Sequence, residues 1–357
     1  MELNYRPKLP EKPRPIAIIG AGGIVNDAHL PAYRMASFPV FGITDIARDK
    51  ADSTAKKFDI PQVFDTVEQL VSASPKDAIF DIALPAGAFV QTIAKLPDGA
   101  GVLLQKPMGD SFDDAKKILS ICRKKKLKAA VNFQLRYSPF VTAARDIISR
   151  GLIGDIYDME VRVSVQMPWD LFPSVKLHPR LEITYHSIHY IDLIRSFLGE
   201  PRGIHAKTVR HPAKQLSSTR TIMILDYGDS IRAGINTNHD HDFGPQNQES
   251  FIKWEGTRGA IKAKMGLLMN YPHGVPDLFE YCLLPQAGTP QWSSEKLAGS
   301  WFPHGFVGTM SSLQRYVEGS EASVPTNVED AIKTMGCVEA AYASGASGGT
   351  AIPAIAI

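Results

Sequence analysis

A glycine-rich turn directly follows a short apolar strand near the start of the chain. Residues 16–19 are all apolar, and Gly20, Ala21, Gly22 and Gly23 come next. Four apolar residues bounded by glycine are typical of a buried parallel strand, and this glycine spacing lets the strand turn sharply into a helix. The turn frees backbone N–H groups that, with the positive end of the helix dipole, favour a pyrophosphate, which a side chain at position 22 would obstruct. The turn therefore predicts a dinucleotide-binding site.

Asp45 supports the same interpretation, because it ends the next apolar strand, 40–44, about twenty residues after the turn. A carboxylate at this spacing accepts hydrogen bonds from the adenosine ribose hydroxyls and repels a 2′-phosphate, which favours NAD. Arg48 and Lys50 lie close enough to keep NADP possible. Val25 replaces the third glycine of the fingerprint, so an ordinary strand, turn and helix is the alternative.

Strands and helices alternate over the first third of the chain. This order is typical of a doubly wound parallel sheet, in which ligands gather at the carboxyl ends of the strands. We therefore predict a Rossmann dinucleotide-binding domain over 15–134, preceded by a Pro-rich arm, 1–14, that could lie on a partner subunit. The expected strands are 16–19, 40–44, 62–64, 78–84 and 101–104, and the expected helices are 28–37, 50–58 and 67–72.

The pattern changes from residue 156 to longer strands joined by hairpins. We predict that 135–357 is a substrate and oligomerisation domain with a mostly antiparallel open sheet, so that the whole fold is α/β plus α+β. Its outer face could pair with another subunit, which predicts a homodimer or homotetramer. The expected strands are 156–166, 203–208, 221–226, 230–236, 249–255 and 259–263, and a closing helix is expected over 328–344.

The composition excludes several classes of function. The 357 residues are 44% hydrophobic and 21% charged, with a formal net charge of +2, so nothing suggests a nucleic-acid or membrane surface. Cys122, Cys282 and Cys337 are isolated, which argues against a disulfide framework or a zinc knuckle. No apolar run reaches membrane-spanning length, and the opening residues do not form a signal peptide, so we expect a cytoplasmic protein.

Several motifs in order resemble the Gfo/Idh/MocA family of oxidoreductases over 15–349. Besides the glycine turn and Asp45, these are residues 81–85 (DIALP), 105–108 (QKPM), 151–154 (GLIG) and 189–192 (HYID). The resemblance implies reversible hydride transfer between NAD and a carbinol carbon of a sugar, sugar acid or inositol. A redox-neutral NAD-dependent glycoside-cleaving enzyme and a non-catalytic nucleotide-binding relative are the alternatives, and a metal-dependent isomerase is the least favoured.

Lys106 is the catalytic lysine that this resemblance implies. It ends a buried strand and precedes Pro107, whose peptide bond is often cis in the family, so it would point into the crevice beside the nicotinamide. There it could hydrogen-bond the reacting hydroxyl and stabilise a developing oxyanion, and burial would lower its pKa. A surface lysine after a strand is the structural alternative. Gln105 stands where the family has glutamate, so the charge of that glutamate is missing.

His189 is our candidate general acid and base, because imidazole exchanges protons near neutrality. In a helix over 182–192, Tyr185, His189 and Asp192 would share one face, with His186 one turn before His189. The family carries an aspartate four residues before this histidine, where Tyr185 stands here. Tyr185 or His186 could take the partner role.

Two alternatives compete for these histidines. Both could be ordinary helix histidines, or metal ligands with Asp192 or with His239 and His241, although no four-ligand spacing is evident. A sugar-contacting loop explains His239 more simply. The predicted catalytic residues are Lys106, His189, Tyr185 and His186. The predicted cofactor-binding residues are Gly20, Gly22, Gly23, Ile24, Asp45, Arg48, Leu84, Pro85, Gln105, Lys106 and Arg136. The predicted substrate-binding residues are Lys106, Asn132, His186, His189, Asp192, His239 and His304, with Trp169, Trp301 and Phe306 as a possible apolar wall.

Overall fold

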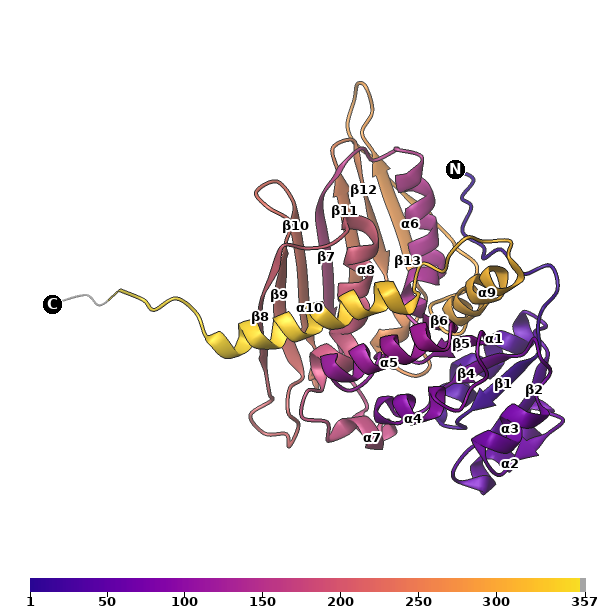
Figure 1. The fold of residues 1–357 in the computed structure, drawn as a ribbon. Helices are drawn as coiled ribbons and strands as arrows, with labels where there is room; N and C mark the ends of the chain where they lie inside the picture. Colours follow the sequence, from indigo (N-terminus) through magenta and orange to yellow (C-terminus); the bar gives the residue numbers. More distant parts are fainter. Residues whose placement is uncertain (354–357) are drawn as a thin grey trace.

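Two β-sheets organise the molecule, one from each half of the chain (Figure 1). The computed structural model describes residues 1–353, except for the side chain of Ser174. The last part of the predicted second domain, 354–357, lies outside the described residues.

The first sheet is parallel and has the strand order β3-β2-β1-β4-β5-β6, which confirms the predicted doubly wound Rossmann sheet. The order reverses between β1 and β4, so a crevice for ligands is expected beyond the carboxyl ends of these two strands. The sixth strand was not predicted. The strands are β1 (Ile16–Ile19), β2 (Val40–Thr44), β3 (Val63–Phe64), β4 (Ile79–Ile82), β5 (Gly101–Leu104) and β6 (Lys128–Val131).

Helical segments follow the strands of this sheet, and two of them have side-chain caps. Thr66 accepts a hydrogen bond from the backbone N–H of Gln69, and Ser111 accepts one from that of Asp114. Such caps satisfy N–H groups that have no partner within the helix. The segments are η1 (Val25–His29), α1 (Leu30–Met35), α2 (Arg48–Phe58), α3 (Val67–Ala73), η2 (Ala86–Ala88), α4 (Phe89–Ile93) and α5 (Phe112–Lys124).

The second sheet has eight strands in the order β14-β13-β12-β11-β7-β10-β9-β8. Its neighbouring strands are antiparallel except for β7 and β10, which confirms the predicted mostly antiparallel sheet. The last two strands were not predicted. The strands are β7 (Ile156–Ser164), β8 (Gly203–Val209), β9 (Arg220–Asp226), β10 (Arg232–Asn238), β11 (Glu249–Gly256), β12 (Gly259–Lys264), β13 (Leu278–Leu283) and β14 (Trp292–Glu295).

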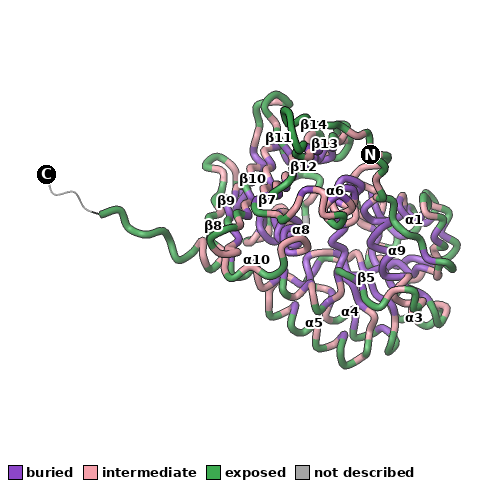
Figure 2. Tube along the Cα trace, turned by 90° about the horizontal axis from the view of Figure 1, so that it is seen from above, coloured by how far each residue is buried: buried purple, intermediate pink, exposed green. Residues whose placement is uncertain are grey.

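Helices cover one face of the second sheet. The alternation in β9 makes this plain, since Met223 and Leu225 are buried whereas Ile222 and Ile224 are 63% and 51% exposed. Buried residues, purple in Figure 2, run along the strands and the inward sides of helices such as α8. The helices over this sheet are α6 (Pro139–Ser149), α8 (Ile188–Leu198) and α10 (Val328–Ser347). Short helical segments complete the half: η3 (Gln134–Tyr137), η4 (Trp169–Leu171), α7 (Pro173–Lys176), η5 (Ile183–Ser187) and η6 (Gly266–Asn270).

One helix from the second half of the chain packs on the first sheet. Helix α9 (His304–Glu318) lies against α1, β5 and β6 (Figure 1). Its residues Phe306, Met310 and Leu313 share a buried cluster with Ile16 and Ile18 of β1. The core of the first sheet therefore involves residues of both predicted domains.

The N-terminal arm is held by its own chain. The Thr142 hydroxyl donates to the Tyr5 carbonyl at 2.8 Å, and the Arg14 N–H donates to Gln314 Oε1 at 2.7 Å. These two contacts attach the arm to α6 and α9 of its own chain, whereas the sequence had suggested a contact with a partner subunit.

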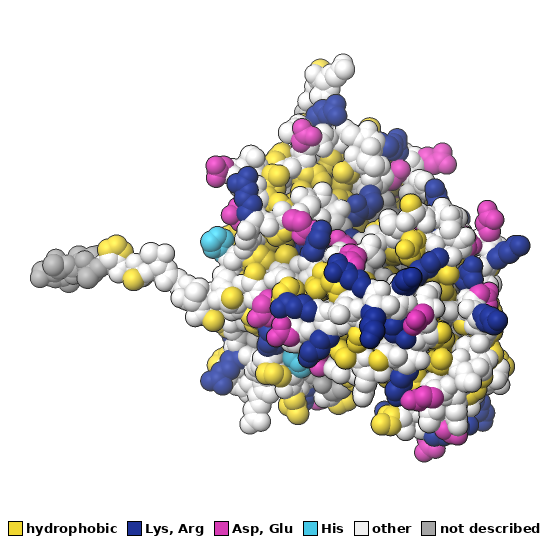
Figure 3. Space-filling model, in the orientation of Figure 1, with side chains coloured by type: hydrophobic (Ala, Val, Ile, Leu, Met, Phe, Trp, Pro, Cys, Tyr) yellow, Lys and Arg dark blue, Asp and Glu magenta, His cyan; other side chains and the backbone are white. Residues whose placement is uncertain are grey.

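The surface over α5 and α10 carries charges of both signs (Figure 3). The basic run at the end of α5 is paired in part, because Arg123 lies 2.5 Å from Glu329 and Lys125 lies 2.8 Å from Asp98. Such ion pairs are typical of a solvated, charged surface. No helix within residues 1–353 has the length and apolarity needed to span a membrane.

Candidate active site

The glycine turn has the geometry that a dinucleotide needs. Gly20 has φ of +112°, and a Cβ there would lie 2.5 Å from the Ala83 carbonyl oxygen, so only glycine fits. A Cβ at Gly22 would have no atom within 4 Å, which leaves open space at the position where the fingerprint brings a pyrophosphate. Leu84 packs against the turn at 3.3 Å from the Cβ position of Gly20. These features fit an NAD molecule.

Asp45 ties the end of β2 to this turn. Its Oδ2 accepts a hydrogen bond from Ala21 N at 2.7 Å, and its Oδ1 accepts one from Ala47 N at 2.8 Å. Each carboxylate oxygen has a further lone pair for a ribose hydroxyl. Arg48 instead forms ion pairs with Asp52, at 2.9 Å, and Asp65. Its guanidinium is thus paired with one carboxylate of α2 and one between β3 and α3, which argues against the predicted cofactor contact, and we do not propose it.

Lys106 is held at both ends. Its backbone N–H donates to Gln105 Oε1 at 2.8 Å, and its Nζ donates to the Tyr185 carbonyl oxygen at 2.8 Å. The Lys106–Pro107 peptide bond is cis, as the resemblance implied. Although the residue keeps some exposed surface, burial of its ammonium lowers the pKa of Lys106 to about 8. The fixed geometry and the lowered pKa are typical of a catalytic lysine.

His189 and His186 meet Lys106 where η5 continues into α8. Burial and the nearby charge of Lys106 hold the pKa of His189 well below its usual value. Burial, followed by His239, Lys106 and His189, does the same for the pKa of His186. Both imidazoles are therefore neutral at pH 7 and can accept a proton. His189 stacks edge-on against Trp301 at 5.3 Å between centroids, and its Nδ1 has no hydrogen-bond partner within the described chain.

A buried carboxylate behind these histidines was missed by the sequence analysis. Glu182 is fully buried and accepts hydrogen bonds from the hydroxyls of Ser187, at 2.9 Å, and Thr221. His239 Nε2 lies 3.3 Å from Glu182 Oε1, within ion-pair distance, although its N–H is not aligned with that oxygen. The His239 ring lies 4.4 Å from that of His186. The signal available in the sequence was a glutamate between Leu181 and Ile183, shortly before Tyr185.

Tyr185 contributes its backbone rather than its hydroxyl to the contact with Lys106. The hydroxyl donates to Asp110 Oδ1 at 3.1 Å, and the ring packs edge-on against His178 at 5.0 Å. Burial, with Asp110 nearby, raises the pKa of Tyr185. The hydroxyl therefore stays protonated and engaged with Asp110, which argues against a direct proton-transfer role.

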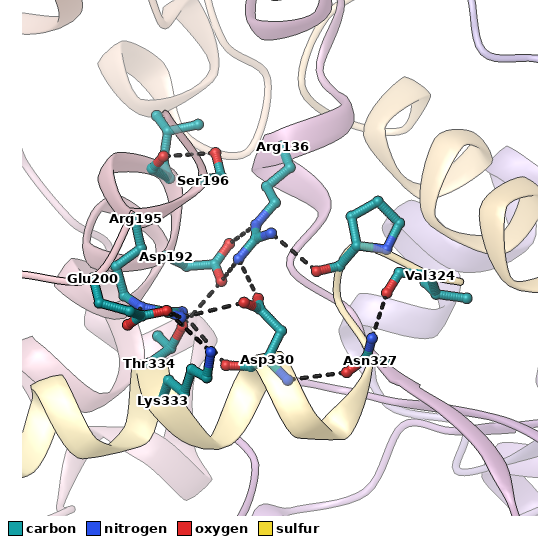
Figure 4. A network of polar contacts seen from close by, with 12 residues as sticks. Arg136, Asp192, Arg195, Ser196, Glu200, Val324, Asn327, Asp330, Lys333 and Thr334 are labelled. Atoms are coloured by element: carbon teal, nitrogen blue, oxygen red, sulfur yellow. Dashed lines mark hydrogen bonds and ion pairs between the residues drawn. The ribbon is translucent and has the colours of Figure 1, made fainter. Parts of the chain in front are cut away.

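Arg136 and Asp192 belong to a network of ion pairs that joins α8, α10 and η3 (Figure 4). Arg136 donates from Nε and Nη2 to the two oxygens of Asp192, each at 2.6 Å, and from Nη2 to Asp330 at 2.7 Å. Arg195 also pairs with Asp330, at 3.2 Å. We had predicted a cofactor contact for Arg136 and a substrate contact for Asp192. The structure instead commits both side chains to each other, which is a structural role.

The remaining predicted residues lie around this site. Asn132 is fully buried, with Nδ2 3.5 Å from His29 Nε2. His304 begins α9 and accepts a hydrogen bond from Ser300 N at 3.2 Å. Pro85 precedes η2 and is exposed, and Ile24 precedes η1. Within residues 1–353, no group of three or more His, Cys, Asp or Glu side chains is arranged to hold a metal ion.

Comparison with known proteins identifies both halves of the chain. The profile of the oxidoreductase family with an NAD-binding Rossmann fold matches residues 14–133, and that of the GFO/IDH/MocA C-terminal domain matches 141–262. D-apiose dehydrogenase of Rhizobium rhizogenes is 26% identical over 262 residues, which are 70% of this chain and 71% of that protein. D-xylose 1-dehydrogenase (NADP(+)) 2 of Haloferax volcanii is 23% identical over 69% of this chain and 74% of that protein.

Solved structures of low sequence identity share the whole fold. Levoglucosan dehydrogenase, in complex with NADH and levoglucosan, superposes with a TM-score of 0.76 at 17% identity, covering 94% of this chain and 98% of that one. An Agrobacterium radiobacter oxidoreductase in complex with NAD⁺, L-tartaric acid and magnesium has the same TM-score of 0.76 at 21% identity, covering 94% and 97%. The fold and the glycine turn thus define an NAD-binding oxidoreductase. The chain belongs to the GFO/IDH/MocA family.

Proposed function

We propose that the protein is an NAD-dependent dehydrogenase that oxidises a secondary or hemiacetal hydroxyl of a sugar or polyol. The observation that carries this proposal is the meeting of Lys106, His186 and His189 at the carboxyl end of β5, in the same parallel sheet as the glycine turn. The apiose, xylose and levoglucosan dehydrogenases among its relatives support a sugar as the substrate.

The chemistry follows from the protonation states of these side chains. A neutral His189 would accept the proton of the substrate hydroxyl, with His186 as the alternative acceptor. The Lys106 ammonium would donate a hydrogen bond to the same oxygen and stabilise the negative charge that develops on it. NAD, when bound, supplies the acceptor for the carbinol hydride. Trp169, packed on His186, and Trp301, packed on His189, offer apolar surface for a sugar ring.

The preference for NAD rests on Asp45. Its carboxylate is oriented toward the glycine turn by two backbone N–H groups, and Arg48, the cation that could attract a 2′-phosphate, is paired with aspartates. The relative from Haloferax volcanii uses NADP(+), so NADP is the alternative cofactor.

The assignment of the two halves and the assembly are part of this proposal. Residues 15–134 would bind the dinucleotide, and 135–357 would bind the substrate and carry the subunit contact. The face of the second sheet that exposes Ile222 and Ile224 supports a homodimer or homotetramer through that sheet. Three cysteines without disulfides support a cytoplasmic location.

The test is the absorbance of reduced nicotinamide while the purified protein meets NAD, then NADP, with a panel of aldoses, deoxy sugars, sugar acids and inositols. Steady formation of NADH with one class of neutral sugar or polyol supports the proposal. Binding of NAD without turnover on the whole panel would contradict it, and product analysis on glycosides would then test the redox-neutral alternative.

A further inference from the structure

A buried chain of polar contacts leads from the backbone of Lys106 into the core of the first sheet. Gln105 Oε1 accepts from Lys106 N at 2.8 Å, and Gln105 Nε2 lies 3.1 Å from His29 Nε2. On the other side of the ring, His29 Nδ1 lies 2.7 Å from Asp81 Oδ2, which also accepts from the Tyr33 hydroxyl at 2.7 Å. His29 and Asp81 have no exposed surface, and Gln105 has 7%. None of the predicted roles accounts for His29, Tyr33 or Asp81.

The directions of these hydrogen bonds follow from one fixed donor. A backbone N–H can only donate, so the oxygen of the Gln105 amide must face Lys106 and its NH₂ group must face His29. An amide NH₂ can only donate as well. His29 Nε2 must therefore be an unprotonated acceptor, and the single ring proton must sit on Nδ1, where it is donated to Asp81.

The other groups around the His29 ring agree with this assignment. The amide nitrogen of Asn132 lies 3.5 Å from Nε2, so a second donor faces the same atom. Burial and the neighbouring Asp81 raise the pKa of Tyr33 well above its usual value, so its hydroxyl remains a donor. Phe306 packs on the ring at 4.9 Å between centroids. Asp81 is the one carboxylate among these described contacts of the ring, and none of them is a cation.

We propose that neutral His29 and Gln105 form a positioning relay that fixes the backbone of Lys106. In this relay Asp81 fixes the tautomer of His29, His29 fixes the orientation of the Gln105 amide, and the amide holds the N–H of Lys106. The effect of this relay on catalysis rests on the proposed role of Lys106. The tautomer of His29 does not depend on that role. His29, Gln105 and Asp81 are positioning residues, since these hydrogen bonds connect them in sequence to the backbone of Lys106.

Gln105 allows a neutral His29 to complete this relay. A glutamate at this position, as in the resembling Glu-Lys-Pro motif, would present an acceptor to His29 Nε2. The ring would then need a second proton to satisfy two carboxylates, the one introduced at position 105 on one side and Asp81 on the other. With glutamine, a single proton satisfies the whole chain of contacts.

The first test uses the unmodified protein and no substrate. With ¹⁵N-labelled histidine, NMR should show His29 with a protonated Nδ1 and an unprotonated Nε2. The signal is assigned by its loss in His29→Asn. A protonated Nε2, alone or as imidazolium, would overturn the proposal, and because no turnover is measured, this result is separate from a failure of the proposed sugar oxidation.

The second test is Gln105→Glu, with the exposed Gln91→Glu of α4 as the control for an added carboxylate. In Gln105→Glu a carboxylate oxygen and the unprotonated Nε2 of His29, both acceptors, would face each other and shift the backbone of Lys106. We therefore expect kcat to fall roughly ten- to hundredfold relative to Gln91→Glu while NADH binding is retained. A kcat of Gln105→Glu equal to that of the control would overturn the proposal.

Discussion

The Nζ atom of Lys106 donates a hydrogen bond to the Tyr185 carbonyl oxygen at 2.8 Å. This contact joins the end of β5 to η5, and thereby the first sheet to the segment that carries both site histidines. The acceptor is a backbone atom, so the identity of side chain 185 does not decide whether the contact forms. The departure from the family pattern at Tyr185 is therefore compatible with a lysine held in place for catalysis.

Tyr185→Phe should retain kcat within about threefold, because it removes the hydroxyl that binds Asp110 and leaves the carbonyl that holds Lys106. Loss of that one hydrogen bond should cost about 1 kcal/mol of the free energy of unfolding. Steady-state kinetics and urea unfolding measure the two effects. A drop in kcat of more than about a hundredfold, with NADH binding intact, would instead give the hydroxyl a catalytic role.

Lys106→Met should lower kcat at least a hundredfold, the scale for removing one donor to a developing oxyanion. It should also stabilise the protein at pH 7, because burying the ammonium lowers its pKa from 10.5 to about 8. This pKa shift sets an upper limit of about 3 kcal/mol on the gain in the free energy of unfolding. Loss of the hydrogen bond to Tyr185 offsets about 1 kcal/mol of that gain. Thermal unfolding measures the gain, with the exposed Lys76→Met as control. A destabilised Lys106→Met would show that the ammonium is well solvated.

The same lowered pKa predicts how oxidation depends on pH. Lys106 is cationic below about pH 8. As the pH rises through that value, the ammonium loses its proton, and this loss should contribute a decrease in kcat for oxidation. In Lys106→Arg, whose guanidinium stays protonated, this decrease should be absent, although the rate is lower. Comparison of the two profiles on one substrate measures it. If the decline persists unchanged in Lys106→Arg, another group is responsible.

Asp45→Asn should weaken NAD binding and reduce the preference for NAD over NADP, each by about tenfold, because the carboxylate that faces the ribose hydroxyls becomes an amide. Fluorescence titration with NADH and NADPH measures both affinities. Asp49→Asn, an exposed neighbour in the first turn of α2, controls for the lost charge. Equal effects of the two substitutions would mean that Asp45 acts only through its negative charge and not through a hydrogen bond to the ribose.

Arg136→Met should cost about 3 to 5 kcal/mol of stability, because it leaves Asp192 buried without its cation. Lys117→Met, which breaks an exposed pair with Asp114, should cost less than about 1 kcal/mol. Denaturant unfolding compares them. In the folded fraction of Arg136→Met, KM for NAD should be unchanged; a raised KM with normal stability would restore the cofactor contact that the ion-pair network argues against.

Much of the fold could be predicted from the sequence because its signals are local. The alternation of strands and helices predicted the parallel first sheet, and the change to longer strands joined by hairpins predicted the mostly antiparallel second sheet. Strand β14 was missed because its residues, WSSE, are mostly polar. Lys106 and His189 were predicted as site residues from their motifs, and the structure brings them close together. Glu182 and His29 were not, because a buried polar residue looks like any helix residue until distant partners such as Thr221 and Asp81 are known.

Arg136 shows that a sequence pattern can also suggest a role that tertiary packing argues against. The resemblance of its segment to the family suggested a cofactor contact, but its partners, Asp192 and Asp330, come from two helices much later in the chain. A sequence pattern identifies that a cation is present, while the partner that neutralises it depends on tertiary packing.

Helix α9 follows every strand of both sheets in the sequence, yet its residues Phe306, Met310 and Leu313 complete the core beneath β1. During synthesis on the ribosome, the nucleotide-binding half therefore remains without part of its core until nearly the whole chain has emerged. For the same reason, exchanging this half between relatives in an engineered chimera would require α9 to be exchanged with it.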